Sequence, residues 1–192
     1  MNLDKTFWSS RYEQGETGWD IGYASPALIA YMENKPRTAK VLIPGAGNAY
    51  EAEKLWEMGF KNITVLDLSE IPLANLKTRI PDFPEKQLVC DDFFNHKAAY
   101  DIILEQTFFC ALSPDLRTKY VQKMAELLAP GGELAGLLFD APMNAEHPPF
   151  GGNKAEYLSL FGEKLQVLEM ESCPNSIAPR MGKEVFFRAI VK

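Results

Sequence analysis

The sequence predicts an α/β fold in which a mostly parallel sheet carries helices on both faces. Short apolar segments of strand length alternate with segments whose apolar residues repeat at helical spacing along most of the chain. This order is typical of βαβ units and of a parallel sheet. The last two strand-like segments, near 165–171 and 184–191, have no helix between them. We therefore expect these two strands to pair antiparallel at or near one edge.

The first half of the chain predicts two successive strand–helix units. Residues 40–44 form an apolar segment that ends at a glycine loop, and residues 49–58 follow with apolar side chains on one helical face. Gly59 is suited to stop this helix. The β-branched segment 63–67 predicts a second buried strand, and Ser69 is suited to cap the next helix.

The second half continues the alternation. Ser113-Pro114-Asp115 offers a cap, an N1 proline and a first-turn acid to a helix, which the turn Pro130-Gly131-Gly132 is expected to end. The Pro/Gly-rich segment 141–153 predicts a loop. The other expected elements are strands at 87–90, 100–105 and 133–139 and a helix at 154–161. With the first two strands and the last two, this makes a seven-stranded sheet.

Length and composition narrow the classes of function. The 192 residues suit one domain over 1–192. The net charge of −6 and the absence of a Lys/Arg cluster argue against a nucleic-acid partner. No apolar run approaches a membrane span and no signal-peptide pattern opens the chain, so the default expectation is a cytoplasmic protein with no membrane partner. A monomer is the default expectation for the oligomeric state. Three scattered cysteines and two histidines predict no metal site.

The loop after the first strand predicts a nucleotide-type site. Gly45 and Gly47 follow the strand and open a helix, where the backbone has to turn tightly and approach a ligand. Asp67 ends the next strand, 20 residues beyond Gly47, and a carboxylate at that spacing is suited to accept hydrogen bonds from ribose hydroxyls. The alternative is that Asp67 only caps the helix after it.

Two further positions bear on the ligand. The third glycine of a dinucleotide fingerprint would fall at Tyr50, whose side chain hinders pyrophosphate approach. Adenosylmethionine has no phosphate, so the sequence favours it over NAD, and an NAD-dependent oxidoreductase stays the alternative. Asp92 and Phe93 follow the third strand, where an adenine ring is expected to lie. The alternative there is a solvated loop with buried phenylalanines.

Several blocks of the chain resemble the thiopurine/thiol/halide methyltransferase family, and they follow one another in the family's order from residue 8 to the C-terminus. The blocks are Trp8–Tyr12, Gly18–Gly22, Ser25-Pro26, the loop VLIPGAGNAYEA, Asp101–Leu112, Pro148–Phe150 and Ile177–Glu184. The resemblance implies a three-layer, Rossmann-like class I methyltransferase fold, S-adenosylmethionine as cofactor, and residues 1–36 as an N-terminal lid segment.

The resemblance also implies roles for individual residues. Trp8, Tyr12 and Trp19 would enclose the donor, and aromatic faces do attract a sulfonium cation. The alternative is that they are core residues of an N-terminal helix. The other implied donor contacts are Gly45 and Gly47 at the methionine portion, Asp67 at ribose, Asp92 and Phe93 at adenine, and Gln106 after the fourth strand.

The acceptor implied by the resemblance is a small soft nucleophile: a thiol, a thiopurine or a halide-like anion. Phe108, Phe150 and the 141–153 loop would line its site, with Arg180 as an anion contact. Arg180 and Glu184 can instead form a structural ion pair, and His147 is either a base or a surface residue. In-line methyl transfer to a soft anion depends on positioning, so no catalytic residue is predicted. An adenosylmethionine-binding protein without turnover remains a third hypothesis.

Overall fold

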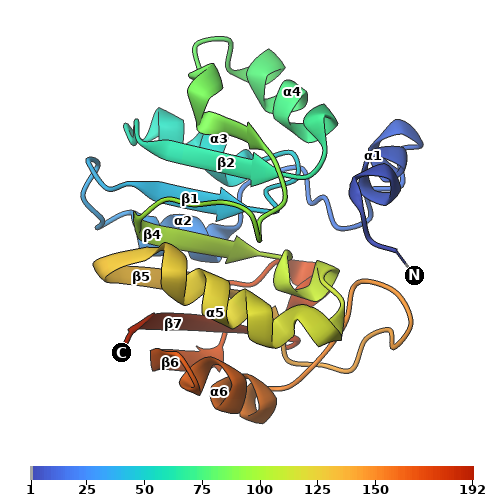
Figure 1. Ribbon diagram of the computed structural model, residues 1–192, viewed down its shortest axis with the longest axis vertical. Coiled ribbons are helices and arrows are strands. Elements are labelled where there is room, and N and C mark those ends of the chain that lie inside the picture. The colour runs from blue at the N-terminus through green and yellow to red at the C-terminus, as the bar shows by residue number, and fades with distance from the viewer. Residues whose placement is uncertain (1) are drawn as a thin grey trace.

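The computed structural model describes residues 2–192 and contains a seven-stranded sheet in the order β3-β2-β1-β4-β5-β7-β6 (Figure 1). Its strands are β1 (Val41–Pro44), β2 (Ile63–Asp67), β3 (Leu88–Cys90), β4 (Tyr100–Gln106), β5 (Leu128–Phe139), β6 (Leu165–Ser172) and β7 (Glu184–Val191). Strands β1 to β5 pair in parallel, whereas β7 is antiparallel to both β5 and β6. The expected antiparallel pairing of the last two strands at one edge is confirmed.

Residues 2–192 form six α-helices: α1 (Lys5–Glu13), α2 (Pro26–Met32), α3 (Tyr50–Glu57), α4 (Glu70–Arg79), α5 (Arg117–Leu127) and α6 (Lys154–Gly162). Helices α2 to α6 pack on the two faces of the sheet, whereas α1 lies beyond the ends of its strands. Ser69 caps α4 as expected, since its hydroxyl accepts a hydrogen bond from the Ile71 N–H at 3.3 Å. Short 3₁₀ turns lie at 85–87, 109–111, 114–116 and 178–180. None of the helices within residues 2–192 combines the length and apolarity that a bilayer crossing requires.

One expected boundary is wrong. The Pro130-Gly131-Gly132 turn does not end α5, which stops at Leu127, but lies inside β5. Tyr100 pairs with Leu128 and Ile102 with Glu133, so residues 129–132 bulge out of the ladder. A Cβ on Gly132 would lie 2.7 Å from the Tyr100 carbonyl oxygen, which explains why glycine is required at this position.

The core forms two apolar layers, one on each face of the sheet. Strand side chains alternate between the layers because successive residues point to opposite faces: Leu42 packs with α5 and α6, and its neighbours Val41 and Ile43 pack with α2, α3 and α4. Tyr120, Tyr157 and Phe161 on the first side and Leu28, Leu55 and Leu76 on the second are fully or almost fully buried. The result is a three-layer α/β structure.

The carboxyl ends of the parallel strands all lie on one side of the molecule. Figure 1 shows α1 beyond the arrowheads of β1 and β2, and the loop that follows β5 on the same side lower down. Ligands of open parallel sheets bind in this region. The N-terminal segment and the 141–153 loop are therefore placed to enclose a site.

Candidate functional site

A cavity of about 930 Å³ lies at the carboxyl ends of the strands. Five parts of the chain line it: the N-terminal segment, the glycine loop with the end of β2, the segment after β4, the loop after β5, and the turn before β7. Of the predicted site residues, those that line it are Trp8, Tyr12, Trp19, Gly45, Asp67, Phe108 and Arg180.

The predicted aromatic residues come together in one wall of this cavity. The ring of Trp19 contacts Trp8 at 5.4 Å and Tyr12 at 5.7 Å between centroids, both edge to face. Each ring is only half-buried, and α1 contributes no fully buried residue to the core. These aromatic residues are therefore not core residues of an N-terminal helix.

Polar contacts hold α1 in place. Its start is capped by Asp4, whose carboxylate accepts from the Phe7 N–H at 3.0 Å. The Ser9 hydroxyl contacts that of Ser69 at 2.9 Å, and Lys5 forms an exposed ion pair with Glu70 at 2.7 Å. Exposed ion pairs add little stability. The position of the aromatic wall therefore depends on a small number of directional contacts.

Both predicted glycines adopt left-handed backbone angles, with φ of +56° at Gly45 and +54° at Gly47. A Cβ on Gly45 would lie 2.2 Å from the ring of Phe108, whereas one on Gly47 would lie 3.2 Å from the Tyr12 hydroxyl oxygen. Close packing of the loop after β4 thus requires glycine at 45. Gly47 borders the aromatic wall without lining the cavity itself.

Asp67 reaches the cavity from the end of β2 with its carboxylate largely buried. One oxygen accepts from the Gly47 N–H at 3.0 Å and the other from the Ser69 N–H at 2.9 Å. Burial raises the pKa of Asp67 above its usual value, and the backbone N–H groups partly offset this. Ser69, rather than Asp67, provides the side-chain cap of α4. Since a carboxylate has about four acceptor sites, Asp67 can accept a further hydrogen bond from a ligand hydroxyl.

Arg180 combines the two roles considered for it. Its guanidinium donates to the Trp19 carbonyl oxygen at 2.9 Å and pairs with the buried Glu184 at 3.5 Å. The structural ion pair is therefore present. The same side chain also lines the cavity, so contact with an acceptor stays a prediction.

Besides Gly47, four predicted residues do not line the cavity. Phe93 is 2% exposed and packs against the Phe108 ring at 5.1 Å, beneath the cavity wall. Asp92 is exposed and accepts from the Phe94 N–H at 2.9 Å, as in the alternative of a solvated loop with buried phenylalanines. Their contact with adenine stays a prediction.

The other two are Gln106 and Phe150. Gln106 ends β4, and its side-chain oxygen is buried without a hydrogen-bond partner. Phe150 is buried and its N–H donates to the Cys110 carbonyl oxygen at 2.7 Å, which anchors the 141–153 loop. His147, Pro148 and Pro149 line the cavity in its place.

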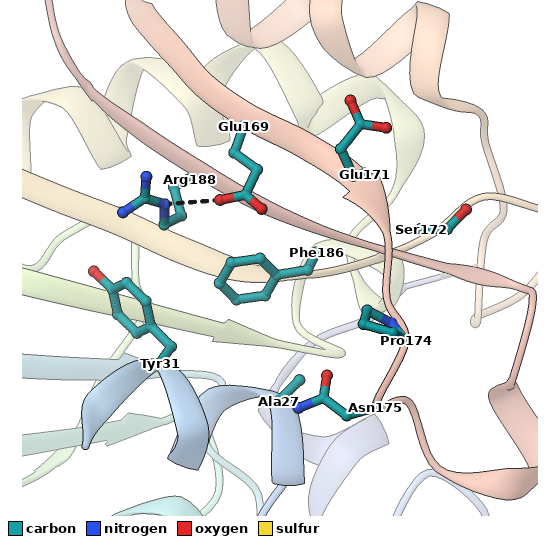
Figure 2. A pocket seen from close by; sticks show the side chains of 9 residues that line it. All are labelled: Ala27, Tyr31, Glu169, Glu171, Ser172, Pro174, Asn175, Phe186 and Arg188. Atoms are coloured by element: carbon teal, nitrogen blue, oxygen red, sulfur yellow. Dashed lines mark hydrogen bonds and ion pairs between the residues drawn. The ribbon is translucent and has the colours of Figure 1, made fainter. Parts of the chain in front are cut away.

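A second, smaller hollow of about 320 Å³ lies between α2 and the ends of β6 and β7 (Figure 2). Figure 2 shows Glu169 of β6 joined to Arg188 of the neighbouring strand β7 along one wall of the hollow. This ion pair measures 3.1 Å, and Glu171 pairs with Lys154. None of its residues lines the larger cavity. Its charges satisfy one another, so the larger cavity is the candidate site.

Residues 3–187 match the model of the family described as Thiopurine S-methyltransferase (TPMT). The chain belongs to this family. Its relatives include a probable thiol methyltransferase 2 of Arabidopsis thaliana, 28% identical over 187 residues that cover 92% of this chain and 81% of the relative. A thiopurine S-methyltransferase of Vibrio parahaemolyticus is 27% identical, with 88% and 87% covered. The protein is a methyltransferase that depends on adenosylmethionine.

A solved structure supports the fold. The 1,6-didemethyltoxoflavin-N1-methyltransferase of Burkholderia thailandensis, crystallised with bound 1,6-didemethyltoxoflavin and S-adenosylhomocysteine, superposes with a TM-score of 0.77. The match covers 98% of this chain and 87% of that one at 21% identity. The predicted class I methyltransferase fold and family are confirmed. The predicted cofactor, adenosylmethionine rather than NAD, is confirmed as well.

The residues around the cavity fit this cofactor. The half-buried faces of Trp8 and Trp19 offer a surface that attracts a sulfonium cation. The carboxylate of Asp67, two residues before the Ser69 cap of α4, lines the cavity and can accept a hydrogen bond from a hydroxyl of the cofactor. Among residues 2–192, no group of three or more His, Cys, Asp or Glu side chains is arranged to hold a metal ion.

Glu105 also shapes the site, although it was not among the predicted residues. It is completely buried and its carboxylate accepts from the N–H groups of Phe108 and Phe109 at 2.8 and 2.9 Å and from the Tyr120 hydroxyl. Burial raises the pKa of Glu105 to about 7. These bonds hold the tight turn that begins at Thr107, whose φ is +56°. An acid at the end of an otherwise apolar strand was the available signal.

Two cavity residues of α1 were also missed, Phe7 and Arg11. They lie next to Trp8 and Tyr12 on the same side of the helix, because residues four apart share a face. The sequence offers no apolar stripe that predicts this helix, so it gave no signal for these two residues. Leu68, directly after Asp67, lines the cavity as well.

Proposed function

We propose that the protein transfers the methyl group of adenosylmethionine to the sulfur of a small thiol or to a similar soft anion. One observation carries this: a single cavity joins the Asp67 and aromatic side to a more apolar side formed by residues after β4 and in the 141–153 loop. Its volume of about 930 Å³ is at the upper end of small-molecule sites. The family name and the relatives' names support a sulfur acceptor.

The residues contribute by positioning. When bound, adenosylmethionine supplies an electrophilic methyl group. Asp67 orients the ribose, and the aromatic wall excludes water and faces the sulfonium. Phe108, Phe139 and Met143 surround the acceptor with apolar surface, which holds its sulfur in line with the methyl carbon and the departing sulfur.

Cations at the acceptor side favour an anionic nucleophile. Arg180 and Lys183 both line the cavity, and a nearby positive charge lowers the pKa of a thiol. A thiolate then attacks the methyl carbon without a strong base. Its electron pair forms the new sulfur–carbon bond, and the pair of the breaking methyl–sulfonium bond stays on the sulfur of the donor. His147 lines the cavity from an exposed loop and is not required as a base. Cys110 also lines it, but burial raises the pKa of its own thiol to about 12.

Calorimetric titration with adenosylmethionine, adenosylhomocysteine and NAD tests the donor. A methylation screen over thiols, thiopurines and halides, read by mass spectrometry, then tests the acceptor. We expect adenosylhomocysteine to bind and a thioether to form. Binding of NAD alone would overturn the donor assignment, and binding without transfer to any acceptor would favour the protein without turnover.

The proposal also includes a monomer that acts in the cytoplasm on a small molecule, with neither nucleic acid nor membrane as partner. The net charge of −6 supports this because nucleic-acid binding requires a basic surface. Cys90, Cys110 and Cys173 are free thiols in the structure, which suits a reducing compartment. Light scattering coupled to size-exclusion chromatography measures the oligomeric state, and a dimer mass would contradict the monomer.

A further inference from the structure

The carboxylate of Asp20, next to Trp19 in the N-terminal segment, contacts the glycine loop. One oxygen accepts from the side-chain amide of Asn48 at 2.5 Å and lies 3.5 Å from the Tyr50 hydroxyl. The other oxygen accepts from the Gly22 N–H at 2.7 Å. Asp20 thus joins its own turn to the loop that carries the cofactor-binding glycines.

Asn48 is held in the orientation that this contact requires. Its side-chain oxygen accepts from the amide of Asn75 at 2.9 Å, and its carbonyl oxygen accepts from Arg79. Arg79 is fixed in turn by Glu53 at 2.6 Å. Turning the amide of Asn48 over would place two donors against each other, so its N–H₂ group faces Asp20.

Neither Asp20 nor Asn48 lines the cavity, but their neighbours form its donor side. Trp19 is part of the aromatic wall, and Gly47 lies beneath the Tyr12 hydroxyl. Since α1 buries no residue completely, no apolar core fixes the wall. The Asp20–Asn48 bond is a direct link from the wall to the glycine loop.

We propose that this bond is a latch that holds Trp19 over the donor, which makes Asp20 and Asn48 positioning residues for donor binding. The inference rests on the proposed function, because it takes adenosylmethionine as the ligand between wall and loop. Loss of the latch lowers the fraction of molecules whose wall is in place. The apparent affinity for the donor falls by the same factor.

An exchange of the two side chains tests the latch. In Asp20→Asn two amides face each other, and in Asn48→Asp two carboxylates do. In the double variant the pairing is restored with its direction reversed: the new amide at 20 donates to the new carboxylate at 48. That carboxylate still accepts from Asn75, and the amide oxygen at 20 still accepts from Gly22.

Calorimetry with S-adenosylhomocysteine measures the outcome. We expect each single variant to bind about 10-fold more weakly, as for a hydrogen bond to a charged group, and the double variant to return to within about threefold of wild type. Asp82→Asn, the same change at an exposed position, should bind like wild type. Kinetics should show a raised KM for the donor with an unchanged KM for the acceptor.

Tryptophan fluorescence gives a second readout. Two of the three tryptophans, Trp8 and Trp19, line the cavity, while Trp56 packs against Phe83 at 5.1 Å. The change on adding S-adenosylhomocysteine should saturate at higher concentration in the single variants, with Tm unchanged. Wild-type affinity in both single variants, or a double variant as weak as the singles, would overturn the latch. Failure of the wild type to bind would overturn the proposed function instead.

Discussion

The guanidinium of Arg180 donates a hydrogen bond to the carbonyl oxygen of Trp19, 2.9 Å away across 161 residues of sequence. This contact ties the turn before β7 to the N-terminal wall of the cavity. Arg180 also pairs with Glu184 of β7 and lines the cavity. A substitution that keeps its charge can therefore distinguish a structural role from contact with an acceptor.

Arg180→Lys keeps the positive charge beside Glu184 but loses the fork that reaches Trp19. We expect adenosylhomocysteine to bind about threefold to 10-fold more weakly, with loss of one hydrogen bond of ~1 kcal/mol. If Arg180 also contacts an anionic acceptor, kcat/KM should fall more for a carboxylated thiol than for a neutral thiol. An equal fall for both acceptors would restrict Arg180 to its structural role.

Asp67→Ala removes the carboxylate that faces the cavity at the end of β2. We expect donor binding to weaken by roughly 1.5–3 kcal/mol, the contribution of charge-assisted hydrogen bonds. Calorimetry with adenosylhomocysteine measures this. Asp67→Asn keeps one acceptor oxygen and should give an intermediate loss. If Asp67→Ala binds as tightly as wild type, the carboxylate serves only the backbone of its own loop.

Gly45→Ala places a methyl group against Phe108 at a backbone angle that L-residues rarely adopt. We expect the free energy of unfolding to fall by about 1–3 kcal/mol from overpacking, with a further ~1–2 kcal/mol from the positive φ. Urea unfolding measures the loss. The control is Gly162→Ala at the end of α6, where a Cβ meets no atom within 4 Å and φ is not positive. That variant should be neutral or slightly stabilised, and an equal loss in both would exclude the clash.

Relief of the same clash is the complementary test. Phe108→Ala in the Gly45→Ala background removes the ring that the new methyl group meets. The double variant should lose less stability than the sum of the single variants, because the two residues are in contact. Additive losses would show that the backbone angle alone makes alanine unfavourable at 45.

Glu105 predicts a pH dependence of stability. Burial raises its pKa to about 7 in the folded state, above the usual 4.5, so the folded state binds the proton more tightly. The contribution of Glu105 to the free energy of unfolding is therefore fully present below about pH 4.5 and is lost as the pH rises through 7. The whole change is on the order of 3 kcal/mol.

The difference between wild type and Glu105→Gln isolates this group, since the other titrating groups are common to both. We expect wild type to gain stability relative to the variant as the pH falls from 7.5 to about 5. Urea unfolding across this range measures it. A difference that stays flat with pH would show that Glu105 has the same pKa in both states.

Local patterns predicted most of the fold. The strands β1 to β4 and the helices α3, α4 and α6 lie within a few residues of their expected ranges, because their apolar periodicity and caps are contained in the segments themselves. The start of β5 was mispredicted, since the bulge at 129–132 exists only through pairing with Tyr100 and Ile102. Helix α1 carries no apolar stripe into the core, so periodicity gave no signal for it.

The sequence by itself determined the order of the seven strands and of helices α3 to α6 along the chain, the family, and the gathering of Asp67 with the glycine loop at one edge of the sheet. Only the tertiary structure decided which side chains share the cavity. It buried Phe93 under Phe108, set Glu105 beneath the loop after β4, and joined Asp20 to Asn48. Periodicity and capping act over a few residues, whereas these contacts depend on where distant segments meet.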